Sequence, residues 1–308
     1  MTEIPAQEIP KPASALFAGW SAIVIVGIMI FAKGLAYLFS GSAAVFSSLI
    51  DSLADIMMSG TALMALKMSL KPADSGHRYG HGKIEGLFAL VQAVVIMGGA
   101  SVIVVNALLR LAEPEKLTDQ GLAAGVIILS LILTIILTTI QKKALREHES
   151  LAIESDHAHY KTDLILNGSV LTVLIATYYG APYWIDSVCA LGIAVYVGRT
   201  GYEVGTNAVN MLLDREVEED TRQAIIDIIL SHKEVQDVHD LRAIRSGMKT
   251  IISFDIEVDP NILLWSAHEI ALDVERDILK SFPLAEIMIH VDPAGSPIDQ
   301  RHIKKIVI

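Results

Sequence analysis

Two short stretches, far apart in the sequence, carry side chains that bind divalent metal ions: Asp51-x-x-x-Asp55 and His159-x-x-x-Asp163. On a helix, residues four positions apart lie on one face, one turn from each other. Both stretches lie in long apolar runs, so two packed helices would bring three carboxylates and one imidazole together. This ligand set suits a divalent cation such as Zn²⁺ in tetrahedral geometry.

The apolar surroundings of these ligands make their charge expensive. One Asp near the centre of a membrane helix costs about 3 kcal/mol on translocon-insertion scales. A bound cation, a water-filled cavity or protonation must offset that cost, and all three are features of a transport path. The alternative is that Asp51 and Asp55 only cap a helix or line a polar turn. The same spacing on a second apolar run favours the metal site.

A second group of ligand-type residues, Asp74, His77 and His81, lies in the Gly-rich stretch 74–85. In one interpretation, the stretch folds around a single metal ion. In the other, it is a polar loop whose histidines bind no metal, and both interpretations stay open. Lys83 and Glu85, which follow, are expected to form ion pairs near the membrane surface. Asp214 is a candidate partner for Lys83.

Further ligand-type residues lie in the last third of the chain and form a third candidate site. They are His239, His268, His290 and Asp292. The spacing His290-x-Asp292 places both side chains on one face of a strand. A lone histidine in such a region is usually a polar surface residue, but a small α+β fold is able to bring these four together as a metal site.

The composition excludes several classes of protein. Of 308 residues, 52% are hydrophobic and 19% charged, with a mean hydropathy of +0.49, which is too apolar for an ordinary soluble domain. A formal net charge of -11 without a basic stripe argues against nucleic-acid binding. The single cysteine excludes an intramolecular disulfide and a Cys-rich zinc site. We expect no organic cofactor.

The apolar residues group into six segments of membrane length. These segments are residues 15–39, 42–70, 84–111, 118–144, 151–179 and 183–207. Lys and Arg gather in the connections 71–83 and 142–146, so the positive-inside rule places both termini in the cytoplasm. Lys33 is isolated in the first segment, and its long side chain allows the interpretation that it snorkels towards the interface. Asp156, two turns before Asp163, is expected to line an entrance.

The chain after residue 207 has the pattern of a small soluble domain. Alternating apolar residues predict strands, and apolar residues at helical spacing predict helices. The helices are expected at 216–232 and 263–282, and the strands at 235–245, 250–259 and 286–291. The predicted fold is therefore an α-helical membrane protein with six transmembrane helices and a cytoplasmic α+β (αββαβ) domain. The predicted boundaries are a cytoplasmic tail at 1–14, a transmembrane domain at 15–207 and a cytoplasmic domain at 208–308.

With these motifs the chain resembles the cation diffusion facilitators, and "HRYGHGKIEG" and "SDHAHYKTDLILN" are similar to the bacterial zinc/iron-efflux branch, the YiiP-type proteins. The resemblance covers nearly the whole chain. It implies a homodimeric metal/proton antiporter of the bacterial inner membrane, a secondary transporter and not an enzyme. It also implies a ferredoxin-like fold for 208–308, a domain for metal binding and dimerisation.

The same resemblance assigns the site residues. The transport site is implied to be Asp51, Asp55, His159 and Asp163; the loop site Asp74, His77 and His81; and the cytoplasmic site His239, His268, His290 and Asp292. Asp292 is implied to bridge two ions. Asp255 stands where YiiP-type relatives have a histidine, and a carboxylate there would harden the cytoplasmic site.

The histidine among the transport ligands favours Zn²⁺ as substrate, with Cd²⁺ and Fe²⁺ as co-substrates, because Mn²⁺ prefers oxygen ligands alone. Zn²⁺ is also expected as a structural or regulatory ion in the cytoplasmic domain. Protons and the lipid bilayer are the other expected partners. Two alternatives remain: a membrane metallohydrolase that activates water, and a metal-sensing scaffold whose helices only anchor it.

Overall fold

The computed structural model describes the chain except residues 1–12, 41–42, 113–120, 180–181, 183 and 296–308. Most of the predicted tail, and parts of the predicted short loops, therefore lie outside the described residues. The chain divides into a helical unit, residues 12–210, and a carboxy-terminal unit that begins at residue 211. Each unit has its own packing and is described by itself.

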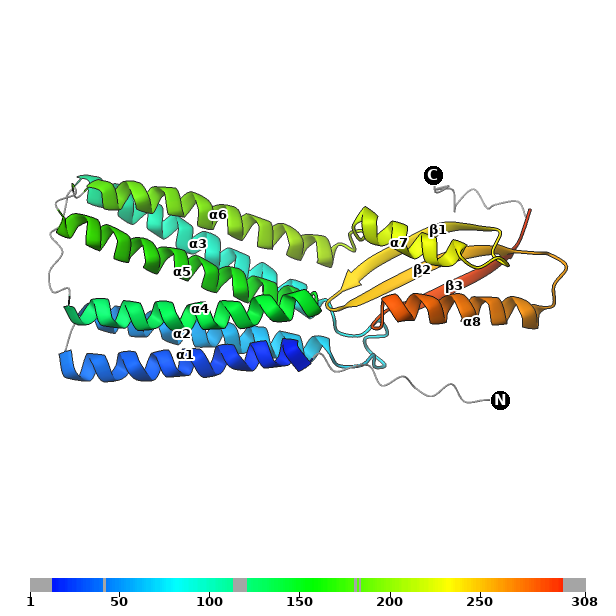
Figure 1. Cartoon of the computed structure of the whole chain (residues 1–308), viewed down its shortest axis with the longest axis horizontal. Helices are drawn as coiled ribbons and strands as arrows, with labels where there is room; N and C mark the ends of the chain where they lie inside the picture. Colours follow the sequence, from blue (N-terminus) through cyan, green and yellow to red (C-terminus); the bar gives the residue numbers. More distant parts are fainter. Residues whose placement is uncertain (1–12, 41–42, 113–120, 180–181, 183, 296–308) are drawn as a thin grey trace. The chain divides into compact units, whose positions relative to one another are not determined.

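Six long helices form the helical unit, as the apolar runs predict (Figure 1). They are α1 (Ala13–Ser40), α2 (Ala43–Ser69), α3 (Ile84–Ala112), α4 (Gly121–Glu147), α5 (Leu151–Tyr178) and α6 (Trp184–Leu212). Among the described residues, α1 to α4 contain stretches long and apolar enough to cross a membrane. The last helix extends to Leu212, five residues beyond the predicted end.

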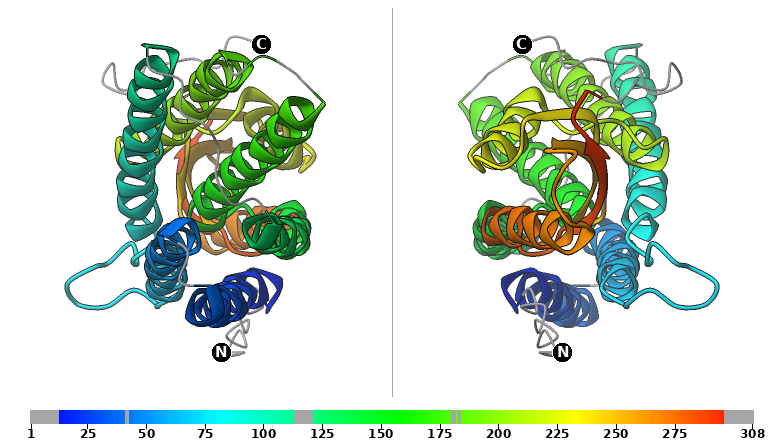
Figure 2. Two further views of the ribbon diagram at one scale, coloured as in Figure 1. Left: turned by 90° about the vertical axis from the view of Figure 1, so that its left-hand side faces the viewer. Right: turned by 90° about the vertical axis from the view of Figure 1, so that its right-hand side faces the viewer.

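The helices of the bundle pack through small and branched apolar side chains. Helix α1 lies against α2 and α4, and α5 lies against α2, α3 and α4. The end-on views of Figure 2 show α6 beside α3. At Gly201 of α6, a Cβ atom would lie only 2.7 Å from Met97 Cγ of α3, so a glycine is needed for this close approach.

The carboxy-terminal unit has the predicted αββαβ order. Its elements are α7 (Glu219–Leu230), β1 (Asp237–Ser246), β2 (Lys249–Val258), α8 (Leu264–Ser281) and β3 (Glu286–Pro293). The strands form one sheet in the order β1-β2-β3, with β1 antiparallel and β3 parallel to β2. Gly247, with φ at +63°, occupies the tight turn between β1 and β2, where a side chain would be strained.

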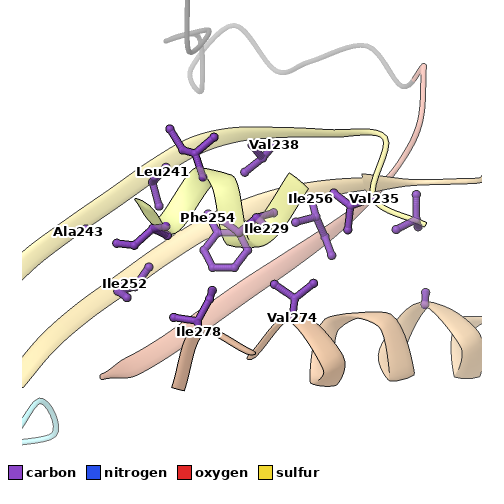
Figure 3. Close-up of a cluster of buried hydrophobic side chains, with 14 residues drawn as sticks. Ile229, Val235, Val238, Leu241, Ala243, Ile252, Phe254, Ile256, Val274 and Ile278 are labelled. Atoms are coloured by element: carbon purple, nitrogen blue, oxygen red, sulfur yellow. The ribbon is translucent and has the colours of Figure 1, made fainter. Parts of the chain in front are cut away.

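One face of this sheet is covered by the two helices. Ile252, Phe254 and Ile256 of β2 point into an apolar core with Ile229 of α7 and Ile278 of α8, as Figure 3 shows. These side chains are fully buried, and each contributes about 1.5–3 kcal/mol to folding. Because side chains alternate along a strand, residues 253, 255 and 257 face the opposite, open side of the sheet.

A bulge in β1 changes which of its side chains point to the core and which to the open face of the sheet. The register between β1 and β2 shifts between His239 and Arg242, and Asp240 adopts a φ of +49° there. The extra residue lets Val238 and Leu241 both reach the core. His239 is therefore on the open face, opposite Asp255 of β2.

Candidate metal centres

The first candidate centre lies between α2 and α5. His159 Nε2 is 3.2 Å from Asp55 Oδ1 and 3.5 Å from Asp163 Oδ2. The three ligand atoms lie within 4.8 Å of one another, and all three side chains are half-buried. These three residues are called the helix trio below. Helical spacing places His159 and Asp163 one turn apart on α5, and the packing of α5 against α2 supplies Asp55.

The geometry of the helix trio suits a tetrahedral cation. Ligand atoms at bond lengths of about 2.0–2.1 Å in a tetrahedron are about 3.3–3.4 Å apart, close to the two separations observed around His159 Nε2. Asp51, the fourth predicted ligand, is exposed one turn before Asp55 and lies outside the trio. Three of the four predicted transport ligands are thus brought together in this structure.

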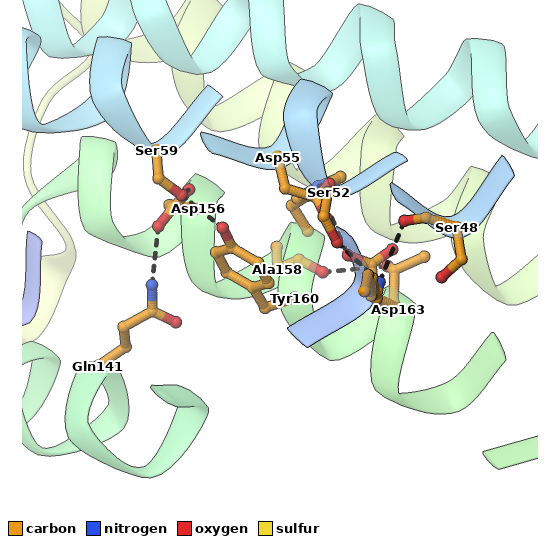
Figure 4. A network of polar contacts seen from close by, with 12 residues as sticks. Ser48, Ser52, Asp55, Ser59, Gln141, Asp156, Ala158, Tyr160 and Asp163 are labelled. Atoms are coloured by element: carbon orange, nitrogen blue, oxygen red, sulfur yellow. Dashed lines mark hydrogen bonds and ion pairs between the residues drawn. The ribbon is translucent and has the colours of Figure 1, made fainter. Parts of the chain in front are cut away.

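A buried polar network adjoins the trio (Figure 4). Asp156, expected to line an entrance, is instead only 3% exposed. Its carboxylate accepts hydrogen bonds from Ser59 Oγ at 3.0 Å and from Gln141 Nε2 at 2.8 Å. The Tyr160 hydroxyl is 2.6 Å from Ser59 Oγ. The network ties α2, α4 and α5 together one turn from the metal ligands, and it satisfies a carboxylate that burial would otherwise make costly.

Glu85 is not the surface ion-pair partner that its position predicts. It is fully buried and accepts hydrogen bonds from Ser69 Oγ at 2.5 Å, Ser150 Oγ at 2.7 Å and the backbone N–H of Ala152 at 3.2 Å. The carboxylate therefore joins the last residue of α2 and the first turn of α3 to the start of α5, where a helix dipole favours negative charge. Glu85 thus holds in place the start of α5, the helix that carries His159 and Asp163.

The second candidate centre is in the connection between α2 and α3. Asp74 Oδ1 is 3.3 Å from His77 Nδ1, and Asp74 Oδ2 is 3.4 Å from His81 Nε2. Hydrogen bonds from the backbone N–H groups of His77 and Gly76 hold the pKa of the Asp74 carboxyl below its usual range. The three predicted loop ligands thus meet, but Asp74 and His77 are largely exposed to solvent.

The third candidate centre is on the open face of the sheet. His239 Nδ1 is 3.5 Å from Asp255 Oδ2, and His239 Nε2 is 3.6 Å from Asp292 Oδ2. Asp292 Oδ1 is also 3.1 Å from His290 Nε2. The sheet register explains this group, since Asp255 pairs with His239 on one side and with His290 on the other. We call His239, Asp255, His290 and Asp292, with Glu257, the sheet-face group.

Glu257 belongs to this group but is absent from the predicted ligands. Its Oε1 lies 3.7 Å from His239 Nε2, and it pairs with Asp292 across the sheet. The spacing Asp255-x-Glu257 repeats that of His290-x-Asp292, so the strand period could have identified it. His268 is exposed on α8 and lies outside the described set of converging ligand atoms, with its ring 6.4 Å from that of Trp265.

The predicted ion pair of Lys83 with Asp214 would join the two units of the chain, and it stays a prediction.

His239 Nδ1 faces Asp255 Oδ2 at 3.5 Å within the sheet-face group. It is a buried nitrogen without a hydrogen-bond partner in the described structure. Buried polar atoms are usually satisfied. The donor set around His239, with carboxylates on both sides, is chemically suited to a divalent ion.

Comparison with known proteins places both units in one family. Residues 19–213 match the family described as "Cation efflux transmembrane domain", and residues 217–294 match "Cation efflux protein, cytoplasmic domain". The chain is similar to the cation-efflux pump FieF of Yersinia pestis (strain Pestoides F). The two are 39% identical over 285 residues, which cover 92% of this chain and 95% of the relative. FieF of Yersinia pseudotuberculosis serotype I (strain IP32953) has the same identity and coverage.

Two solved structures are similar to part of the chain. One is the cytosolic domain of a cation diffusion facilitator family protein, 31% identical, with a TM-score of 0.24; the match covers 25% of this chain and 92% of that one. The other is the metal-bound C-terminal domain of the CzcD transporter from Thermotoga maritima, 30% identical, with a TM-score of 0.24. That match covers 27% of this chain and 100% of the solved one.

Proposed function

The chain belongs to the cation efflux family, and from this premise we propose that it exports a divalent metal cation in exchange for protons. It is a multi-pass membrane protein and a transporter, so the metallohydrolase alternative has no support. Zn²⁺ is the proposed substrate, with Fe²⁺ and Cd²⁺ as co-substrates, because one imidazole among carboxylates suits these ions better than Mn²⁺.

The helix trio is the observation that carries this proposal. Asp55, His159 and Asp163 converge inside the unit that matches the family's transmembrane domain. Three ligands leave at least one coordination position for water or for Asp51, which is one helical turn from Asp55.

Proton coupling follows from the chemistry of the ligands. A metal ion needs a neutral imidazole and ionised carboxylates, so binding releases protons, and protonation releases the metal. Histidine is the natural exchanger, because the ordinary pKa of imidazole, about 6.5, lies close to cytoplasmic pH. We propose that α2 and α5 alternate between two arrangements that open the trio to opposite sides of the membrane.

The proposed setting is the bacterial inner membrane, with six helices crossing the bilayer and both termini in the cytoplasm. The Lys and Arg residues of the connections 71–83 and 142–146 support this orientation. We propose further that the chain is a homodimer and that the sheet-face group and the loop residues Asp74, His77 and His81 bind ions. Ions at the sheet face would tighten the dimer and bias the transport equilibrium by linkage.

The test is metal flux into proteoliposomes with an imposed pH gradient, for Zn²⁺, Fe²⁺, Cd²⁺ and Mn²⁺. We expect the wild type to carry Zn²⁺ flux that depends on the gradient, and Asp55→Asn to lose it, because the amide keeps the shape but not the charge. Asp227→Asn, on the exposed side of α7, is the matched control and should keep the flux. Zn²⁺ flux that is unchanged in Asp55→Asn would refute the helix trio as the transport site.

A metal-sensing scaffold is the second candidate, and the unsatisfied His239 Nδ1 in the sheet-face group is the observation that favours it. A sensor would lose its function in Asp292→Asn and keep it in Asp55→Asn. The proposed exporter predicts the reverse severity, so the same pair of variants decides between the two functions.

A further inference from the structure

A lysine is buried beside the helix trio. Lys33 of α1 is 6% exposed, and its Nζ donates hydrogen bonds to Ser52 Oγ at 2.7 Å and to the Ser48 carbonyl at 3.2 Å. Both acceptors are on α2. The expectation that Lys33 snorkels to the interface is therefore wrong, because the side chain crosses to the neighbouring helix. An ammonium group is thus held in place within an apolar bundle.

The partners of Lys33 place its charge next to the metal ligands. Ser52 follows Asp51 directly, and Ser48 and Ser52 are one helical turn apart on the helix that carries Asp55. The positive charge of Lys33 is therefore held near the carboxylates of Asp51 and Asp55, and Asp163 belongs to the same trio as Asp55. A positive group beside the site attracts each carboxylate ligand and repels a divalent metal ion.

The charges of the four predicted transport ligands and of Lys33 balance when one divalent ion is bound. Asp51, Asp55 and Asp163 carry three negative charges, His159 as a metal ligand is neutral, and Lys33 carries one positive charge. A divalent cation brings the total to zero. Because uncompensated charge in an apolar medium is costly, the neutral total favours a loaded site that is able to move within the bundle. Without Lys33, the same loaded site would keep one negative charge.

We propose that Lys33 is a resident counter-charge of the transport site, which stabilises the unloaded carboxylates and lowers the affinity for the metal so that it can be released. The proposal rests on the proposed function, since it assumes that the helix trio binds the transported ion. Lys33 acts as a positioning residue, because its side chain contacts Ser48 and Ser52 and does not coordinate the metal. Its influence on the metal is the electrostatic repulsion between the ammonium group and the cation. Its tether to α2 keeps the charge beside Asp55 when the helices move.

The decisive variant is Lys33→Gln, which keeps a hydrogen-bond donor for Ser52 but removes the charge. A unit charge within about 10 Å of a divalent ion, at an effective dielectric constant near 20, changes affinity by at least about tenfold. We therefore expect Lys33→Gln to bind Zn²⁺ at least about tenfold more tightly and to release it more slowly, so that flux at saturating Zn²⁺ falls.

Two comparison variants separate charge from packing. Lys33→Arg keeps the charge and should stay within about threefold of the wild-type affinity. Lys67→Gln is the matched control: Lys67 is on α2, the helix that carries Asp55, lies over the Trp20 ring at 4.3 Å, and is about 18 Å along the helix from Asp55. It should leave affinity unchanged. If Lys33→Gln does not fold, tighter Zn²⁺ binding by Lys33→Arg would itself overturn the proposal.

The measurement is Zn²⁺ binding to the full-length protein in lipid nanodiscs, by competition with a fluorescent chelator, together with flux in proteoliposomes. His77→Ala and His239→Ala in the background of every variant remove the other two candidate centres. Equal or weaker Zn²⁺ binding by Lys33→Gln refutes the counter-charge, even if its flux falls. A wild type that carries no metal flux contradicts the proposed function itself, and a wild type with flux but unchanged Lys33→Gln affinity contradicts only the role of Lys33.

Discussion

The helix trio and the sheet-face group use similar ligands on different frameworks. In the trio, two of three ligands are four residues apart on one helix, and the third comes from a neighbouring helix. In the sheet-face group, β2 and β3 each carry a pair of ligands two residues apart, and His239 comes from β1. Backbone hydrogen bonds between the strands fix the register of these residues. A sheet holds its ligands through its own backbone, whereas a helix pair holds them only through side-chain packing.

The two sites also differ in the groups that compensate their charge. The helix trio has Lys33 close by and a hydrogen-bonded network at Asp156 one turn away. The sheet-face group places Asp255, Glu257 and Asp292 around one buried histidine. A site that must release its ion benefits from a fixed counter-charge and from ligands on helices that can move relative to one another. A rigid, acidic site is better suited to a resident ion that stabilises one conformation.

The largest expected effect comes from removing the histidine of the helix trio, and the histidine of the sheet-face group provides the comparison. His159→Ala should reduce Zn²⁺ flux by at least about 100-fold, since losing a direct ligand exceeds the loss typical of outer partners. His239→Ala should keep at least about a tenth of the flux, because it changes only the regulatory equilibrium. Proteoliposome flux measures both, with His157→Ala as the control on α5. Equal losses in His159→Ala and His239→Ala would contradict the division of roles.

Glu257 sharpens the comparison within the sheet-face group. Glu257→Gln should weaken metal binding there by about tenfold, because it removes one negative charge 3.7 Å from His239 Nε2. Titration of the full-length protein with the His159→Ala background would measure it. Glu286→Gln, an exposed glutamate at the start of β3, is the matched control. An unchanged affinity in Glu257→Gln would remove this residue from the site.

Asp255→His tests whether the carboxylates harden the sheet-face group. Replacing an oxygen ligand by imidazole should raise the preference for Zn²⁺ over Mn²⁺ by about fivefold at that site. The ratio of the two dissociation constants in the same background gives the answer. An unchanged ratio would show that Asp255 is not a ligand.

The smallest effect is expected from the loop centre. His77→Ala should change Zn²⁺ flux by less than about threefold, because exposed charged groups interact weakly in water. The flux assay used for His159→Ala measures it, with Arg78→Ala as the control in the same loop. A loss as large as that of His159→Ala would make the loop a part of the transport path.

The architecture could be read from the sequence almost completely. Hydrophobic runs of 25 residues or so have few alternatives to long helices, and alternation around Ser246-Gly247 has few alternatives to a hairpin. The spacings Asp51-x-x-x-Asp55 and His159-x-x-x-Asp163 also identified three ligands that meet. These local patterns could not predict whether a polar side chain points to the surface or to a neighbouring helix. Lys33 was predicted to snorkel, Glu85 to pair near the membrane surface and Asp156 to line an entrance, yet all three side chains are buried.

The sequence by itself determined which elements form and which residue types could bind a metal, because helix and strand periods are local properties of the chain. Only the tertiary structure decided which of those residues meet. Packing of α5 on α2 selected Asp55 over Asp51, the register of β1 and β3 on β2 brought in Glu257, and His268 stayed on α8 outside the group. These choices depend on contacts between residues up to 104 positions apart, such as His159 with Asp55, which no short sequence window contains.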